Sequence, residues 1–129
     1  MLKSRTTHLA AFIATALYMA AAHAQPPLKT QDGVLVDEKG MTVYTFDQDT
    51  ANSGKSVCND DCAKNWPPVP AADGAKAGGD YTVIQRDDGS HQWAYKGQPL
   101  YTFIKDKKPG DRTGDNVKEA WHVVKGTDQ

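Results

Sequence analysis

The stretch Lys39-Gly40-Met41-Thr42-Val43-Tyr44-Thr45-Phe46 returns later in the chain as Lys96-Gly97-Gln98-Pro99-Leu100-Tyr101-Thr102-Phe103. The second copy lies 57 residues after the first, and the register continues without a gap to Asp49 and Asp106. Self-similarity at a fixed spacing is the signature of a duplicated structural unit. The chain therefore contains a tandem duplication.

A second match extends the duplication toward the C-terminus. Trp66-Pro67-Pro68-Val69 pairs with Trp121-His122-Val123-Val124 at a spacing of 55 residues, so the second copy is shorter by two residues in the intervening loop. We expect one domain over residues 25–129, built of two repeats at about 33–69 and 81–125. A chain of that length suits one small domain.

The β-prone residues of both copies predict antiparallel strands. Residues 34–37 and 42–47 flank Gly40, which can adopt the positive φ of a tight hairpin turn. In the second copy, residues 81–86, 91–95 and 100–104 predict a three-stranded meander. Pro99 is expected at a strand start or an edge, because proline cannot donate a ladder hydrogen bond.

A short helical segment is expected before the tryptophan of each repeat. Residues 59–66 and 115–121 each open on residues that can cap a helix, and Pro-Pro ends the first segment. Residues 70–80, rich in Ala, Gly and Asp, predict an exposed linker. The predicted fold class is mainly β, with tandem-duplicated antiparallel hairpin and meander units and one short helical segment per repeat.

Residues 1–24 have the pattern of a cleavable signal peptide. Lys3 and Arg5 supply a positive n-region, and residues 9–22 form an apolar stretch shorter than a membrane span. Ala22-His23-Ala24 then supplies a small-x-small cleavage pattern. We expect a periplasmic or secreted mature protein with no integral membrane segment after cleavage.

The mature chain is acidic. Loss of Lys3 and Arg5 reduces the 15 Lys and Arg to 13, against 16 Asp and Glu, which gives a net charge of −3. That sign disfavours nucleic acid and anionic membranes as partners.

The two cysteines, Cys58 and Cys62, predict a disulfide. An oxidising compartment favours a bonded pair, and so short a loop makes the bond a local staple. Free thiols that bind a soft metal or exchange disulfides are the alternative. The spacing differs from the C-x-x-C of thioredoxin-like sites, and no βαβ pattern surrounds it.

The two repeats share a pattern with a known family. Tyr44-Thr45-Phe46-Asp47-Gln48-Asp49 and Tyr101-Thr102-Phe103-Ile104-Lys105-Asp106 both fit Yx(FWY)xxD. Residues 58–68 fit CxxxCAxxWPP. Together they resemble the secreted-repeat family of predicted lipoproteins with a Yx(FWY)xxD motif, whose function is unknown. The resemblance covers roughly residues 33–125 and implies an envelope location, although no cysteine for lipid attachment follows the signal peptide.

The motif aromatics are expected to be structural. Alternate strand residues face the same side, so Tyr44 shares a face with Phe46, and Tyr101 with Phe103. We expect these four rings to form a shared core, with an aromatic ligand groove as the alternative. Trp66 and Trp121 are interpreted as structural tryptophans.

The motif aspartates, Asp49 and Asp106, are expected to fix loops by accepting backbone N–H bonds, with ligand or metal binding as the alternative. A calcium site from Asp47, Asp49, Asp60 and Asp61 is disfavoured, since the loop lacks the ligand and glycine pattern of a calcium-binding helix-loop-helix.

His91 and His122 are too few for a convincing zinc or copper site. The sequence offers no nucleophile paired with a base, no phosphate-binding glycine loop and no haem attachment motif.

The leading hypothesis is therefore an exported cell-envelope protein without catalytic residues, metal or cofactor, which binds a small ligand or an envelope protein. The alternative is a periplasmic redox or metal-handling protein that acts through Cys58 and Cys62.

Overall fold

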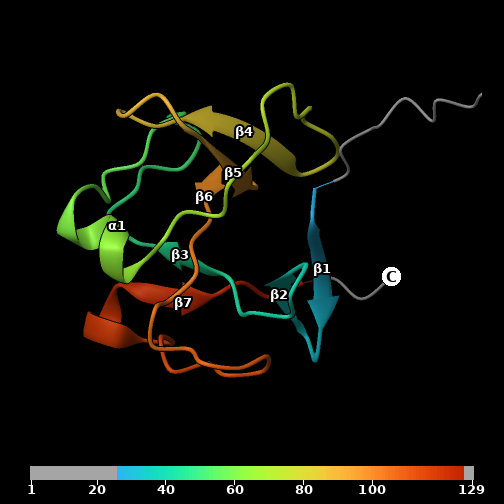
Figure 1. Cartoon of the computed structure of the whole chain (residues 1–129), viewed down its shortest axis with the longest axis vertical. Coiled ribbons are helices and arrows are strands. Elements are labelled where there is room, and N and C mark those ends of the chain that lie inside the picture. The colour runs from blue at the N-terminus through green and yellow to red at the C-terminus, as the bar shows by residue number, and fades with distance from the viewer. Residues whose placement is uncertain (1–25, 127–129) are drawn as a thin grey trace, which may run out of the picture.

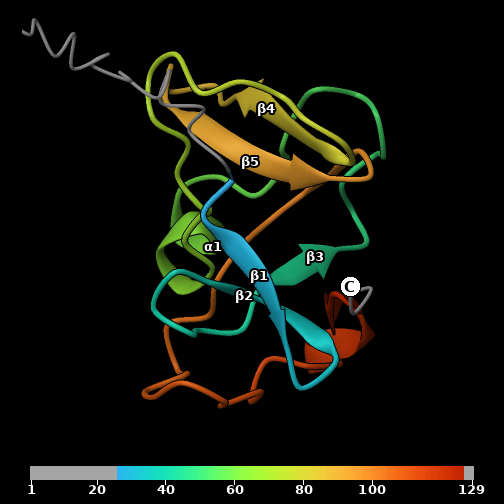
Figure 2. The ribbon, with the colours of Figure 1, turned by 90° about the vertical axis from the view of Figure 1, so that its right-hand side faces the viewer.

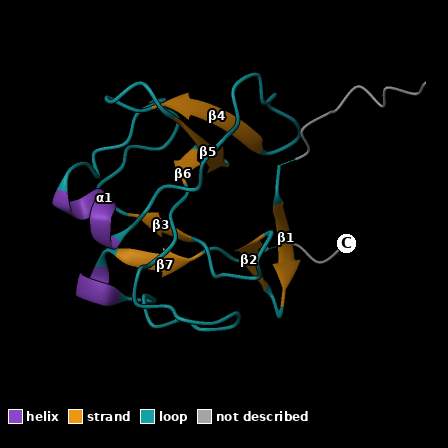
Figure 3. Ribbon diagram, viewed as in Figure 1, coloured by secondary structure: helices purple, strands orange, loops and turns teal. Residues whose placement is uncertain are grey.

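The computed structural model describes residues 26–126, so the predicted signal peptide lies outside the described residues. Short strands pair antiparallel in three small sheets (Figure 1). Loops and turns make up most of the remaining chain (Figure 3). The mainly β fold class, with one short helical segment in each repeat, is confirmed. The elements are β1 (Leu28–Gln31), β2 (Val34–Asp37), β3 (Tyr44–Phe46), α1 (Asp61–Asn65), β4 (Tyr81–Gln85), β5 (His91–Tyr95), β6 (Gln98–Pro99), the 3₁₀ helix η1 (Val117–Glu119) and β7 (Trp121–Val123).

The first sheet is a hairpin of β1 and β2 that the sequence analysis missed. Its register runs from Leu28 opposite Asp37 to Gln31 opposite Val34. The turn residues Asp32 and Gly33 have φ of 51° and 84°. Asp-Gly is a strong signal for a two-residue hairpin turn with positive φ at both positions, so the sequence did contain a clue to this hairpin.

The predicted hairpin of residues 34–47 is shorter than expected. Gly40 turns the chain with φ of 82°, and the Val43 N–H donates to the Leu35 carbonyl at 3.1 Å. Beyond Val43 the chain leaves β2, and β3 pairs with β7 of the other repeat.

The meander of the second repeat forms as β4, β5 and β6. β4 and β5 make the long ribbon at the top of Figure 2. Pro99 lies in the edge strand β6, where its missing N–H interrupts no ladder. The expected third strand over residues 100–104 is wrong, because Tyr101 makes only isolated bridges, to Tyr44 and Pro68.

The two repeats exchange strands with one another. β3 pairs with β7, with Tyr44 opposite Val123 and Phe46 opposite Trp121. In the equivalent pairing, between the second motif segment and the segment after Trp66, the Thr102 N–H donates to the Pro67 carbonyl at 2.8 Å. At the centre of the exchange, the backbone N–H groups of Tyr44 and Tyr101 each donate to the other residue's carbonyl, at 2.7 and 2.9 Å. Neither repeat forms this arrangement alone.

Two clusters of buried side chains form the core. One is mainly aliphatic around Trp93, and it contains Leu35, Val43, Val69, Ala71, Trp93, Tyr95, Leu100 and Val124. The other gathers the motif aromatics with one cysteine, and it contains Tyr44, Cys58, Trp66, Tyr101, Phe103 and Trp121.

The prediction of capping side chains ahead of the two helical segments is wrong. α1 follows Asp60 and η1 follows Asn116, and neither side chain caps its helix. Both residues have positive φ, 55° and 66°, whereas a capping residue needs a β-region backbone. The side chain of Asn59 instead accepts a hydrogen bond from Arg86, and that of Asp115 accepts one from the Val123 N–H.

Candidate functional site

The motif tyrosine of each repeat donates its hydroxyl hydrogen to the motif aspartate of the other repeat. The Tyr44 hydroxyl lies 2.6 Å from Asp106 Oδ2, and the Tyr101 hydroxyl lies 2.5 Å from Asp49 Oδ2. All four side chains are buried. Burial raises the pKa of both tyrosines, and the bond to the carboxyl group raises it further. The phenols therefore keep their protons and act as donors.

The second carboxyl oxygen of each motif aspartate holds the loop that follows its own motif strand. Asp49 Oδ1 accepts the Val57 N–H at 2.7 Å. Asp106 Oδ1 accepts the Thr113 N–H at 2.9 Å and its hydroxyl at 2.5 Å. Each aspartate thus joins a loop of its own repeat to a tyrosine of the other.

Arg86 is a buried cation that the sequence analysis missed. Its guanidinium donates to Gln92 Oε1 at 2.7 Å, to Ser56 Oγ at 3.0 Å and to the Cys58 carbonyl. Arg86 comes two residues after Ile84, and both side chains are buried on the same side of the extended backbone. The alternation of side chains along a strand could therefore have predicted that Arg86 is buried.

Ser56 connects Arg86 to the motif pair of Tyr101 and Asp49. Its Oγ lies 2.6 Å from the Tyr101 hydroxyl, which donates to Asp49. Burial raises the pKa of Asp49, although the hydrogen bonds from Tyr101 and Val57 and the charge of Arg86 act in the opposite direction. Desolvation therefore outweighs the favourable contacts of this carboxyl group.

Four motif rings form a continuous stack, in the order Phe46, Trp121, Trp66, Phe103. Successive ring centroids are 4.1, 3.8 and 3.9 Å apart, with interplanar angles of 11°, 1° and 18°. The two motif tyrosines meet the tryptophans edge-on, at 5.4 and 5.2 Å. Each phenylalanine stacks on the tryptophan of the other repeat, so the ring stack repeats the exchange seen in the strands.

The loop beside the ring stack is fixed differently in the two repeats. In the first, Cys58 and Cys62 form the predicted disulfide, with Cα atoms 5.1 Å apart. In the second, Gly114 follows Thr113 as Cys58 follows Val57, and the N–H groups of Val57 and Thr113 each bind the motif aspartate of their own repeat. A Cβ on Gly114 would lie 2.8 Å from the Trp66 ring and 2.9 Å from the Tyr44 ring. The Gly114 N–H donates to the Tyr44 hydroxyl at 3.2 Å.

A hollow of about 490 Å³ lies where both helical segments meet the ring stack. α1 and η1 lie at the same end of β3 and β7, at the left of Figure 1. We call this space the junction hollow, because both repeats build it. It is lined by Phe46, Gln48, Asp61, Cys62, Asn65, Trp66, Lys118, Ala120 and Trp121.

The second repeat borders the junction hollow with a strained backbone. Asn116, Lys118 and Glu119 have φ of 66°, 53° and 56°. Left-handed backbone at a residue other than glycine costs roughly 1–3 kcal/mol and gathers at functional sites. Lys118 stands at the wall of the junction hollow within this segment.

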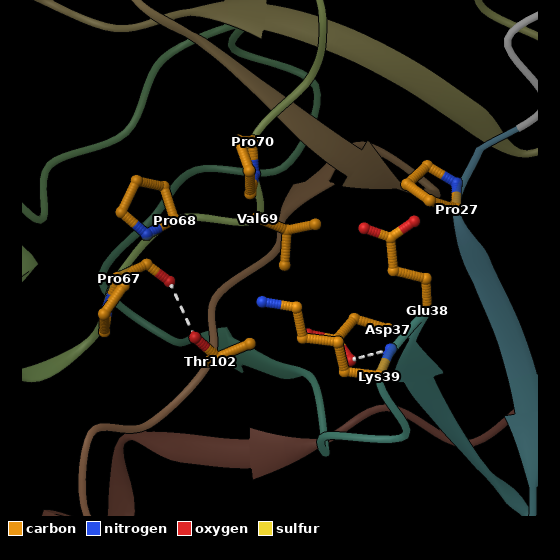
Figure 4. Close-up of a pocket in the computed structure, with 9 residues that line it drawn as sticks. All are labelled: Pro27, Asp37, Glu38, Lys39, Pro67, Pro68, Val69, Pro70 and Thr102. Carbon is orange, nitrogen blue, oxygen red and sulfur yellow. Dashed lines mark hydrogen bonds between the residues drawn. The ribbon is translucent and has the colours of Figure 1, made fainter.

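A proline groove runs along the other side of the Trp66-Pro67-Pro68 segment. Glu38 and Lys39 extend into it from the turn after β2, and proline rings line its opposite wall (Figure 4). The proline groove has a volume of about 340 Å³ and continues into a second space of about 410 Å³ beside Trp93. Proline rings carry no N–H donor, so the wall offers mainly apolar contact.

Three acidic side chains pair with a histidine or a lysine, at separate places in the structure. Asp47 Oδ2 lies 2.8 Å from His122 Nε2, Asp61 lies 3.7 Å from Lys64, and His91 lies 3.4 Å from Asp73. Within residues 26–126 no group of three or more His, Cys, Asp or Glu is placed to hold a metal ion.

In the described part of the chain, no helix is long and apolar enough to cross a membrane. No curated protein matches this chain significantly. No solved structure matches it significantly either. A family model described as a secreted repeat of unknown function matches residues 28–70 and, a second time, residues 82–125. Two matches that together span most of the chain, and that coincide with the two exchanging halves, show that this protein belongs to that family of secreted repeats.

Proposed function

We propose that this protein is an exported, non-enzymatic binding protein whose two repeats form a rigid platform around a small-ligand site in the junction hollow. The observation that carries the proposal is the make-up of this hollow. Phe46, Trp66 and Trp121 line it from both repeats, together with a few polar side chains. Ligand sites are typically hollows of about 300–1,000 Å³ with apolar walls and few polar groups.

The state of the motif residues supports binding rather than catalysis. The Tyr44–Asp106 and Tyr101–Asp49 pairs are buried and bonded to one another. A general acid or base works best with a pKa near the working pH, whereas burial moves the pKa of both tyrosines upward, away from neutrality. The motif therefore serves as the frame of the platform.

The predicted signal peptide and the family description support action in the cell envelope, in the periplasm or outside the cell. The proline groove is the less suitable ligand site, because one aromatic side chain, Trp93, borders it, whereas three line the junction hollow. The junction hollow carries amide, carboxylate and ammonium groups at its wall.

The proposal is tested by native mass spectrometry of protein isolated from the periplasm of the cells that make it. Ala120→Phe fills the junction hollow without removing a motif side chain, and Ala72→Phe adds the same ring to the exposed segment beside the proline groove. We expect a bound mass in the wild-type protein and in A72F, and none in A120F. Bare wild-type protein, or a mass that A120F retains, contradicts the proposal.

A second candidate function is thiol–disulfide exchange, and one observation favours it. Cys62 lines the junction hollow, whereas Cys58 is buried. A partner thiolate would attack the sulfur of Cys62 and release Cys58 as the thiolate. A reduction potential of about −120 to −200 mV would support this function, and one below about −300 mV indicates a structural bond.

A further inference from the structure

We infer that the junction hollow takes a small organic carboxylate with a flat apolar body, bound by the indole N–H groups of Trp66 and Trp121 and by the ammonium group of Lys118. This inference rests on the proposed function and specifies its ligand.

The first step concerns the two indole N–H groups. Trp66 and Trp121 are only 6% and 3% exposed, and a buried indole N–H usually has an acceptor. Neither indole donates a hydrogen bond to the described residues. Among those same residues, no fully buried side-chain nitrogen or oxygen lacks a partner. Both N–H groups must therefore reach the surface, and both residues line the junction hollow.

The second step concerns charge. Lys118 lines the junction hollow, and within residues 26–126 it takes part in no ion pair. The one carboxylate of the wall, Asp61, already faces Lys64 at 3.7 Å. We infer that both indole N–H groups open into this hollow, which gives it two donors beside a cation that forms no ion pair within residues 26–126.

The third step matches a ligand to these donors. A carboxylate has two oxygens that only accept, and hydrogen bonds to an ionised acceptor are roughly twice as strong as neutral ones. Phe46 is half-buried at the end of the ring stack and offers apolar surface to a flat body. The volume of about 490 Å³ is sufficient for a single ring with its carboxylate.

The strained backbone of the second repeat agrees with this assignment. Lys118 has φ of 53° between Asn116 at 66° and Glu119 at 56°. In the first repeat the matching segment is the regular turn of α1. The left-handed backbone sets the position of Lys118 in the wall, so the strain is stored beside the one unpaired cation of the site.

Benzoate is the test ligand, and benzamide is its neutral counterpart of the same shape. The readout is the set of three indole ¹⁵N–¹H signals of the full mature protein, in which Trp93 lies in the other core cluster and serves as internal reference. We expect benzoate to shift the signals of Trp66 and Trp121 and leave that of Trp93 in place. Benzamide should bind about tenfold more weakly, because hydrogen bonds to an ionised acceptor are stronger than those to a neutral one.

Two variants test whether the ammonium group of Lys118 binds the carboxylate of benzoate. Lys118→Gln should weaken benzoate binding about tenfold. Lys76→Gln removes an exposed lysine that does not line the hollow, and it should leave the affinity unchanged. An unshifted Trp93 signal in each variant shows that the fold is intact.

Equal shifts with benzoate and benzamide, or an unchanged affinity in K118Q, would overturn the carboxylate assignment while leaving a ligand-binding hollow. No shift of either indole would also overturn it. In that case a bound mass in the native spectrum, lost in A120F, still supports the proposed function, so the two failures are distinguishable.

Discussion

The loops that follow the two motif strands meet the same ring stack with different chemistry. In the first repeat a disulfide and a buried arginine hold the loop, and a regular α-turn follows. In the second repeat a glycine packs directly on Trp66 and Tyr44, and a left-handed segment follows. The tyrosine–aspartate bonds and the ring stack are the same in both halves. The shared contacts form the frame, and the loops are free to differ where the junction hollow opens.

The largest expected effect tests the shared frame. Trp66→Ala and Trp121→Ala each remove the centre of the ring stack, and each should lower the free energy of unfolding by about 3–5 kcal/mol. Because both indoles stack on one another and on a phenylalanine, the two losses should be similar. Chemical denaturation of both variants measures this, with the exposed Val57→Ala as control. A loss in only one of them would show that one half alone carries the core.

The next effect separates the two loops. Arg86→Met leaves Ser56, Gln92 and the Cys58 carbonyl without their donor, which should cost about 3 kcal/mol. Arg112→Met is the matched change on the second repeat, because among residues 26–126 the Arg112 side chain donates to the Asp32 carbonyl alone, and it is exposed. Its cost should stay within about 0.5 kcal/mol. Equal midpoints of denaturation for R86M and the wild-type protein would show that the buried network adds no stability.

A third comparison sets the disulfide against the glycine. Replacing Cys58 and Cys62 by alanine should cost about 2 kcal/mol, as expected for so short a loop. Gly114→Ala should cost a similar amount, about 1–3 kcal/mol, because the added Cβ meets rigid rings. Gly78→Ala is the control, since a Cβ there has open space. A G114A protein as stable as the wild type would mean that the ring stack shifts to admit the methyl group.

The smallest effect is a pH dependence on the first repeat. Burial raises the pKa of Asp49 in the folded protein, so the folded state holds this proton more tightly than the unfolded chain. The stability that comes from the protonated carboxyl is present at low pH, and it is lost as the pH rises from about 4 through the folded pKa. The difference in unfolding free energy between the wild-type protein and Asp49→Asn should therefore decline over that range. A difference that is constant with pH would contradict the raised pKa.

Local signals in the sequence predicted most of the strands. The strands at residues 81–85 and 91–95 were predicted from β-prone residues on both sides of a turn. The disulfide between Cys58 and Cys62 was predicted from the cysteine count and the expected oxidising compartment. The pairing of β3 with β7 could not be predicted from local pattern, because it joins residues about 77 apart whose hairpin partners looked equally suitable. The exchange depends on packing between whole repeats.

The candidate site was harder to predict than the fold. Gln48, Asn65 and Lys118 carry no motif, and surface polar residues of this kind occur throughout the chain. The left-handed backbone at Lys118 has no sequence signal, since neither Lys nor Glu favours positive φ. Only the placement of both helical segments at one end of the ring stack brings these side chains together.

The exchange between repeats also governs the time course of folding during synthesis. Asp106, the hydrogen-bond partner of Tyr44, lies 62 positions later in the chain, and β7, which pairs with β3, ends at Val123. A chain that emerges with its N-terminus first therefore cannot close its aromatic core until nearly all of it has been made. Closing such long loops is entropically costly, so contacts of this kind form slowly. For a member of a family of secreted repeats, a core that closes late is compatible with passage of the unfolded polypeptide through a translocation pore.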